Sequence, residues 1–250
     1  MSVALRAVGL TKAWGAFMAN DDVSLELQVG ERHALIGPNG AGKTTFIDLL
    51  TGVVPPTAGE VFIGDENVTG LAQHERVRRG MTRTYQLTSL FPGLTVVESI
   101  VLAILEREGK ASEWLRPVAS YIEAEDEARA LLERLHLAGE ADQPTKYLAY
   151  GKQRLVEIAL ALASRPKILL LDEPAAGIPA SQSAEVFEAI AGLPPDVTIL
   201  FIEHDMQIVF RFAQRISVMV GGRMLVAGSP DAIARDSRVK EVYLGEAQDG

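Results

Sequence analysis

The strongest constraint on the fold is a glycine-rich loop with the sequence Gly37-Pro38-Asn39-Gly40-Ala41-Gly42-Lys43-Thr44. It matches the phosphate-binding pattern G-x-x-x-x-G-K-[ST] at every fixed position. The apolar run 33–36 precedes the loop, and residues 45–50 follow it with helical character. Such a loop works between a buried strand and a helix, because the helix N-terminus offers N–H groups and a positive dipole end to a phosphate. The chain is therefore predicted to bind a nucleoside triphosphate. A chance match in a glycine-rich turn would not explain these flanks.

The side chains of the loop fit a nucleotide that carries Mg²⁺. The glycines let backbone N–H groups converge on phosphate oxygens. Lys43 adds a mobile positive charge for the β- and γ-phosphates, and the Thr44 hydroxyl suits Mg²⁺.

Two adjacent carboxylates form the second chemical feature. Asp172 and Glu173 follow the aliphatic run 168–171, so both stand at the C-terminal end of a predicted buried strand, where open α/β sheets bind ligands. Asp172 suits Mg²⁺, through water or directly, and Glu173 is suited to orient or deprotonate a water. Solvated acids at a strand end are the alternative, but a P-loop enzyme needs such a carboxylate.

The order of periodic segments predicts an α/β core interrupted by a helical lobe. Strands are expected at 3–10, 23–29, 33–36, 60–64, 168–171, 197–202, 216–220 and 224–227. Helices are expected at 45–50, 96–105, 122–137, 152–164 and 181–191, followed by two short ones in the tail. The first tail helix is predicted to begin with Ser229 as its cap and Pro230 in its first turn.

A third feature is the segment Leu148-Ala149-Tyr150-Gly151-Lys152-Gln153-Arg154. It resembles the L-S-G-G-Q signature loop of the ATP-binding subunits of ABC transporters, and the likeness extends over about residues 5–244. The family's other motifs occur in order, namely the adenine-stacking aromatic Trp14, the Q-loop glutamine Gln86, the catalytic glutamate Glu173, the D-loop Ala176-Gly177-Ile178-Pro179 and the switch histidine His204.

The resemblance implies an ATPase. Its fold would be a RecA-like P-loop core with an antiparallel β subdomain, at about 1–86 and 165–250, and an inserted helical subdomain at about 87–164. ATP would be bound by Trp14 and by residues 37–45, Thr45 included. Gln86, Glu173 and His204 would be catalytic, and Thr44, Gln86 and Asp172 would bind Mg²⁺.

Within the family, the chain is most similar to the ATP-binding subunits of branched-chain amino-acid importers. The L-A-Y-G signature and the stretches 173–177, 202–206 and 242–245 carry this likeness. It implies a peripheral protein on the cytoplasmic face of the inner (cell) membrane. There it would pair head to tail with an identical or homologous ATP-binding subunit, under two integral membrane permease subunits. A periplasmic or extracytoplasmic substrate-binding protein would deliver the cargo. The signature loop, Leu148 to Lys152, would act on the ATP held by the other subunit.

Three positions depart from the family pattern. The signature serine is Ala149, the signature glutamine is Lys152, and the D-loop acid or amide is Pro179. The alanine removes one hydroxyl donor to the γ-phosphate, and a hydrogen bond to a charged group is worth about 1.5–3 kcal/mol. Lys152 brings a cation near the expected interface. The ATPase prediction stands, but the motifs no longer indicate a high turnover.

The composition limits the partners. Asp and Glu number 33 against 24 Lys and Arg, a net charge of −9, which is poorly suited to non-specific nucleic-acid binding. The chain has no cysteine and therefore neither disulfide nor thiol chemistry. No apolar signal core and no run of about 18 apolar residues are evident. Any membrane role is therefore expected to come through partners, and no nucleic-acid partner is expected.

Other residues have simpler interpretations. His33 is expected to be structural, and the arginines are expected on a solvated helix face and the strand leading to Gln86, namely Arg76, Arg78, Arg79 and Arg83. The apolar residues Leu87, Leu90, Phe91 and Leu94 form a candidate surface for a membrane subunit.

Two other functions remain as alternatives. A small-molecule kinase would share the P-loop but would not need the signature segment or His204. The ATPase of an exporter, such as a lipopolysaccharide-extracting complex, is not excluded by fold alone.

Overall fold

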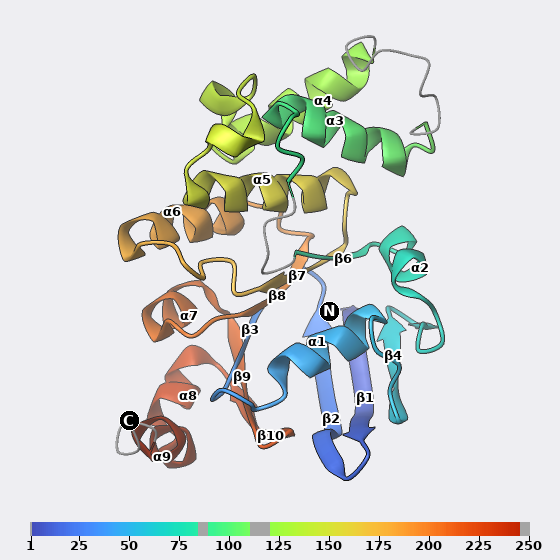
Figure 1. The fold of residues 1–250 in the computed structure, drawn as a ribbon. Coiled ribbons are helices and arrows are strands. Elements are labelled where there is room, and N and C mark those ends of the chain that lie inside the picture. Colours follow the sequence, from blue (N-terminus) through green and yellow to red (C-terminus); the bar gives the residue numbers. More distant parts are fainter. Residues whose placement is uncertain (1, 85–89, 111–120, 246–250) are drawn as a thin grey trace. The chain divides into compact units, whose positions relative to one another are not determined.

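The computed structural model describes residues 2–84, 90–110 and 121–245 (Figure 1). The chain divides into two compact units. The first comprises residues 1–83, 167–173 and 195–250, and the second comprises residues 84–166 and 174–194. The range expected for a helical subdomain thus falls in the second unit, which also contains residues 174–194.

In the described part of the chain, the first unit contains two β-sheets. The smaller sheet is antiparallel, in the order β2-β1-β4-β5, and consists of Val3–Trp14 (β1), Phe17–Gln28 (β2), Ala58–Ile63 (β4) and Glu66–Asn67 (β5). The larger sheet has the order β10-β9-β3-β8-β7-β6. Its strands are Arg32–Ile36 (β3), Met81–Arg83 (β6), Ile168–Asp172 (β7), Thr198–Ile202 (β8), Arg215–Val220 (β9) and Arg223–Gly228 (β10). The strands from β9 to β6 are parallel, and β10 is antiparallel to β9. The predicted α/β fold with an additional antiparallel sheet is confirmed.

The burial of the strands follows their sequence patterns. Every residue of β7 and β8 is buried, as their continuous apolar runs predict for central parallel strands. In β2 the buried residues Val23, Leu25 and Leu27 alternate with exposed Ser24 and Glu26, the period of a strand with one face in water.

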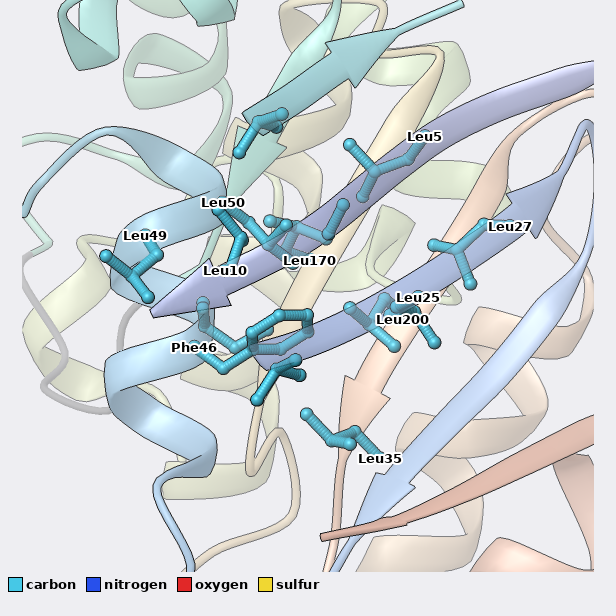
Figure 2. Packing of buried hydrophobic residues seen from close by; sticks show 14 of the residues in the cluster. Leu5, Leu10, Leu25, Leu27, Leu35, Phe46, Leu49, Leu50, Leu170 and Leu200 are labelled. Carbon is cyan, nitrogen blue, oxygen red and sulfur yellow. The ribbon is translucent and has the colours of Figure 1, made fainter. Parts of the chain in front are cut away.

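The helix that follows the P-loop is α1, Lys43–Thr51, and it is fixed to the core by apolar side chains. Phe46, Leu49 and Leu50 are all 0% exposed. Figure 2 shows them beside Leu10 of β1 and near Leu170 of β7, within one hydrophobic cluster. Burying a side chain of this size contributes about 1.5–3 kcal/mol, so these three contacts anchor the helix firmly.

Arg76 contradicts the expectation of a solvated arginine cluster. It lies on α2, Gln73–Arg78, yet it is only 1% exposed, whereas Arg78 on the same helix is exposed. Its guanidinium donates to four carbonyl oxygens, those of Leu49 at 2.9 Å, Leu50 at 2.6 Å, Thr69 at 2.8 Å and Leu71 at 3.1 Å. The first two belong to the last turn of α1, where a cation complements the negative end of the helix dipole. Burial lowers the pKa of Arg76, but a guanidinium remains charged.

His33 is structural, as expected. It is 0% exposed, and its ring nitrogens lie 2.8 Å from Oε1 of Glu31 and 2.8 Å from Oγ of Ser217. These contacts join β3 to its neighbour β9 inside the sheet.

Helices α7 and α8 of the first unit begin with polar caps. Ser229 caps α8, Pro230–Arg235, through a hydrogen bond from the N–H of Ala232 at 3.3 Å, as predicted. Helix α7, Met206–Phe212, was not predicted, although the Asp205 carboxylate accepts the N–H of Gln207 at 2.8 Å. The last helix is α9, Ser237–Gly245.

The second unit is helical in its described residues. It contains Val96–Arg107 (α3), Ile122–Arg134 (α4), Tyr150–Ala163 (α5) and Ala180–Ala191 (α6), with 3₁₀ turns at Ala138–Glu140 and Thr145–Tyr147. Thr95 and Glu98 form a capping box at the start of α3, which explains the acid within that apolar run. Across the described residues, no helix is both long enough and apolar enough to cross a membrane.

Candidate nucleotide-binding site

The parallel sheet of the first unit brings three chemically important segments to one edge. Leu35 of β3 pairs in register with Ile202 of β8, and Ile202 pairs with Asp172 of β7. Strands β3, β8 and β7 therefore end at the same level, spaced about 5 Å from strand to strand. The P-loop follows β3, Glu173 follows β7, and His204 follows β8 by two residues. This carboxyl edge is where open α/β sheets bind ligands.

Two P-loop glycines are required by the path of the backbone. Gly37 has a φ of +152° and Gly42 a φ of +92°. A Cβ atom on Gly37 would lie 2.1 Å from the Met219 carbonyl oxygen, and one on Gly42 would lie 2.4 Å from that of Ala19. Gly42 is also the N-cap of α1 and adds no side-chain cap. The helix N-terminus therefore presents its backbone N–H groups and positive dipole end to a ligand.

The ammonium group of Lys43 lies against the P-loop itself. The residue is 6% exposed, and Nζ donates to the carbonyl oxygens of Gly37 at 2.6 Å and Pro38 at 2.9 Å. These two bonds hold the positive charge at the phosphate cradle, where a triphosphate would meet it.

A pocket of about 270 Å³ opens at the P-loop. Its lining residues are Phe17, Ala19, Asn39, Gly40, Ala41, Gly42, Lys43, Thr44, Thr45, Glu173 and His204. The volume is slightly below the range of about 300–1,000 Å³ for small-molecule sites, which suits the phosphate end of a nucleotide. The structure thus brings together the loop, Glu173 and His204, which lie far apart in the sequence.

The aromatic residue at this pocket is not the one that the sequence singled out. Trp14 is 55% exposed and is not among the described residues that line the pocket, and Lys12 Nζ lies 4.3 Å from its ring centroid. Phe17, which pairs with Trp14 across the β1–β2 hairpin, does line it. That hairpin pairing is the signal that could have found Phe17. Adenine stacking by Trp14 stays a prediction.

Glu173 and His204 form a hydrogen-bonded pair at the pocket. Nε2 of His204 and Oε1 of Glu173 lie 2.8 Å apart. Glu173 has a φ of +50°, which is rare for a residue with a side chain and costs of order 1–3 kcal/mol. Its N–H donates to the Ile202 carbonyl at 3.1 Å, so the chain turns sharply where the strand ends. A carboxylate held in this way can orient a water molecule and accept its proton.

Asp172 fits the Mg²⁺ that the family resemblance implies. Asp172 is 2% exposed, its Oδ2 accepts a hydrogen bond from Arg83, and its buried Oδ1 has no hydrogen-bond partner among the described residues. Burial raises the pKa of Asp172, while the Arg83 guanidinium acts in the opposite direction. A hard cation, bound directly or through water, would satisfy Oδ1.

The small number of protein ligands also suits this ion. No cluster of three or more His, Cys, Asp or Glu side chains that could hold a metal occurs in the ranges that the structure describes. Mg²⁺ usually takes one or two protein oxygens and completes its shell with water and phosphate oxygens. Gln86, the third expected ligand and a predicted catalytic residue, lies outside the described residues.

The signature segment lies in the second unit. Ala149 is the N-cap of α5 and makes no side-chain hydrogen bond there, so the missing serine leaves this helix start without a side-chain cap. Leu148 and Gly151 are buried, and the Lys152 ammonium forms an ion pair with Glu140. The charge of Lys152 is therefore balanced within its own unit.

Tyr150 joins the signature segment to the D-loop. A Cβ atom on Gly177 would lie 3.3 Å from Cε1 of Tyr150, so the ring packs directly on this glycine. The Tyr150 hydroxyl accepts a hydrogen bond from Arg154 at 2.8 Å, and Arg154 is paired with Glu157 at 2.8 Å. Pro179, at the end of the D-loop, is the N-cap of α6 and provides no side-chain hydrogen bond. Sequence reasoning did not find the contact between Tyr150 and Gly177.

Residues 20–176, more than half of the chain, match the ABC transporter family model. This chain belongs to the ABC transporter family. It is an ATP-binding cassette, the ATP-hydrolysing subunit of such transporters, and cassettes of this kind form dimers and work with transporter subunits. The α/β P-loop fold and the predicted nucleotide binding agree with this membership.

Two curated relatives are similar to the chain over nearly its full length. It is 41% identical to the high-affinity branched-chain amino acid transport ATP-binding protein LivG of Salmonella typhimurium, over 99% of this chain and 100% of the relative. It is 35% identical to the lipopolysaccharide export system ATP-binding protein LptB of Escherichia coli, over 97% of each chain.

Two solved structures share the fold. The ADP conformation of MJ1267, an ATP-binding cassette of an ABC transporter, matches with a TM-score of 0.87 at 29% identity, covering 98% of this chain and 100% of that one. The dimeric structure of MJ0796, a bacterial ABC transporter cassette, matches with a TM-score of 0.76 at 26% identity, covering 90% and 98%.

Proposed function

We propose that this cassette hydrolyses ATP to energise an importer of branched-chain or related amino acids. The observation that carries the proposal is the Glu173–His204 pair, 2.8 Å apart, in the same pocket as Lys43 and the N-terminus of α1. The amino-acid cargo is supported by the 41% identity to LivG and by the L-A-Y-G form of the signature segment.

In this proposal the triphosphate lies in the P-loop, and Lys43 exchanges its carbonyl contacts for phosphate oxygens. Glu173 orients a water molecule whose oxygen attacks the γ-phosphorus, while its proton passes to the carboxylate. The bond from that phosphorus to the oxygen shared with the β-phosphate breaks, and ADP leaves with the electron pair. His204 holds Glu173 and contacts the γ-phosphate. Trp14 and Phe17 contact the adenine.

Thr44, Asp172 and Gln86 are the proposed ligands of Mg²⁺. When bound, the ion would neutralise negative charge on the β- and γ-phosphates. The buried Oδ1 of Asp172 supports this assignment most directly.

The proposed assembly contains two cassettes. Each signature segment, Leu148 to Lys152, caps the ATP of the other subunit with the N-terminus of α5, and the second unit corresponds to the helical subdomain. Two integral membrane permease subunits bind the pair on the cytoplasmic face of the cell membrane, and a substrate-binding protein on the opposite side delivers the cargo. The dimeric MJ0796 structure supports the paired arrangement.

Export of a lipid-linked saccharide is the second candidate, because the chain is also 35% identical to LptB. The two functions differ in their membrane partners. Purification of the cassette with its native membrane subunits, followed by uptake assays in vesicles, separates them. ATP-dependent accumulation of labelled leucine, isoleucine or valine supports import. If the complex hydrolyses ATP but accumulates none of these amino acids, the amino-acid assignment is contradicted.

The hydrolytic mechanism is tested with Glu173→Gln. This variant should bind Mg-ATP as the wild type does, while hydrolysis falls by about 10²- to 10⁴-fold. Because ATP is then not consumed, two chains should remain paired around it. Sedimentation should show that the fraction of dimer increases with ATP concentration. Asp196→Asn also replaces an acid by its amide, at an exposed position of the first unit. It is the matched control and should retain activity.

Adding Gly151→Asp to Glu173→Gln should abolish the ATP-dependent dimer, because a carboxylate would then face the γ-phosphate of the opposite site. The assay is repeated with the membrane subunits present, since Ala149 and Pro179 lack side-chain donors. Full ATPase activity of Glu173→Gln would contradict the assigned role of this glutamate. A dimer that survives Gly151→Asp would contradict the paired-site arrangement.

A further inference from the structure

Arg83 was expected on the strand leading to Gln86, but its burial was not predicted. It ends strand β6, and its side chain is 6% exposed. Its guanidinium joins two carboxylates of the first unit. Nη2 donates to Oδ2 of Asp172 at 2.6 Å, and Nη1 donates to Oδ1 of Asp48 on α1. Both anionic partners raise the pKa of Arg83 against the opposing effect of burial.

The two contacts connect the elements that carry the proposed Mg²⁺ ligands. Asp48 lies four residues after Thr44, so both side chains project from the same face of α1. Asp172 is the last residue of β7, the strand that pairs with β6, where Arg83 stands opposite Leu170. A planar guanidinium can hold both carboxylates in fixed directions, which a flexible ammonium cannot.

The two carboxylate oxygens of Asp172 have different surroundings, which suggests a role for the contact with Arg83. Oδ2 is taken by Arg83, whereas Oδ1 is buried with no partner among the described residues. We propose that Arg83 is a positioning residue of the metal site, which turns Oδ1 of Asp172 toward Mg²⁺ while it holds the α1 face that carries Thr44. This inference rests on the proposed function, because it assumes that Asp172 is a Mg²⁺ ligand.

The sign of the effect separates positioning from simple electrostatics. A guanidinium next to a metal ligand repels the cation, so on charge alone the loss of Arg83 would strengthen metal binding. A group that orients a ligand has the opposite effect, because loss of such a neighbour typically weakens metal binding about 10- to 100-fold. The two explanations therefore predict shifts of opposite direction.

The test measures binding of a fluorescent ATP analogue during titration with Mg²⁺, and again in excess EDTA. Arg83→Lys should raise the half-saturating Mg²⁺ concentration about 10-fold or more and change the affinity without metal by less than about twofold. The double variant Arg83→Met with Asp48→Asn removes one charge of each sign. The site therefore keeps its net charge, and this variant should show the same shift. Arg78→Met, an exposed arginine on α2, is the matched control and should show none.

The wild type distinguishes a failure of this inference from a failure of the function. If wild-type binding and hydrolysis of ATP do not depend on Mg²⁺, the proposed function is wrong. If they do, an unchanged or lower Mg²⁺ requirement in folded Arg83 variants overturns the positioning role. An equal loss of affinity with and without metal also overturns it, because Arg83 would then act through the P-loop helix alone.

Discussion

Replacing Arg76 with methionine is expected to destabilise the protein by about 3–5 kcal/mol. The residue is 1% exposed and donates to four carbonyl oxygens at 2.6–3.1 Å. A hydrogen bond from a charged donor is worth about 1.5–3 kcal/mol on its own, but four bonds that share one guanidinium do not add. Methionine restores part of the packing and none of the bonds. The four carbonyl oxygens lose this donor, and an unsatisfied buried acceptor costs about 1–3 kcal/mol, so the shared network is expected to cost more than one bond and less than four.

Thermal unfolding of the purified variant measures this cost. At about 2–4 °C per kcal/mol for a chain of this size, Arg76→Met should unfold about 6–20 °C below the wild type. Arg78→Met, on the exposed side of the same helix, should shift by no more than about 2 °C. Arg76→Lys should recover only part of the lost stability, because an ammonium group keeps the charge but reaches fewer of the carbonyl oxygens. Equal midpoints for Arg76→Met and Arg78→Met would show that the carbonyl network contributes no net stability.

Four further substitutions test three separate features. Lys43→Ala should abolish hydrolysis and strongly weaken ATP binding while the fold survives, and unchanged ATPase activity would remove the P-loop from the mechanism. Trp14→Ala and Phe17→Ala should each weaken ATP binding about 2- to 10-fold without changing the affinity for inorganic triphosphate; an equal loss for triphosphate would contradict contact with the base. In the candidate surface for a membrane subunit, Leu87 lies outside the described residues, Leu90 and Leu94 are partly buried, and Phe91 is 58% exposed. Phe91→Asp should keep basal ATPase activity but fail to support transport in reconstituted vesicles, and normal transport would refute that surface.

The sequence predicted the elements whose information is local. The P-loop needs fixed residue types at fixed spacing between a strand and a helix, and the structure has β3, the loop and α1 in that order. The continuous apolar runs of β7 and β8 likewise predicted fully buried strands. The short elements β5 and α7 were missed, because two to seven residues carry too little periodicity to be recognised.

The burial of the two arginines was missed for a different reason. The sequence places Arg76 on a solvated helix face and Arg83 on the strand leading to Gln86, and nothing near them in sequence indicates that either side chain is buried. The carboxylates that bind Arg83 lie 35 and 89 positions away, and the Leu49 carbonyl that binds Arg76 lies 27 positions away. A buried cation is stable only when such partners lie around it in the folded structure. These partners are distant in sequence, so a single sequence does not show which of them will meet.

Both buried arginines contact the same helix, and this gives the segment 76–83 a structural role. Arg76 binds the C-terminal carbonyls of α1, and Arg83 binds Asp48 on the same helix. Apolar packing of α1 is non-directional and would tolerate rotation about the helix axis, whereas hydrogen bonds to fixed guanidinium groups would not. The rotation of α1 decides where the Thr44 hydroxyl points relative to Asp172. A displacement of segment 76–83 would therefore be transmitted to α1 through both arginines and to Asp172 through Arg83.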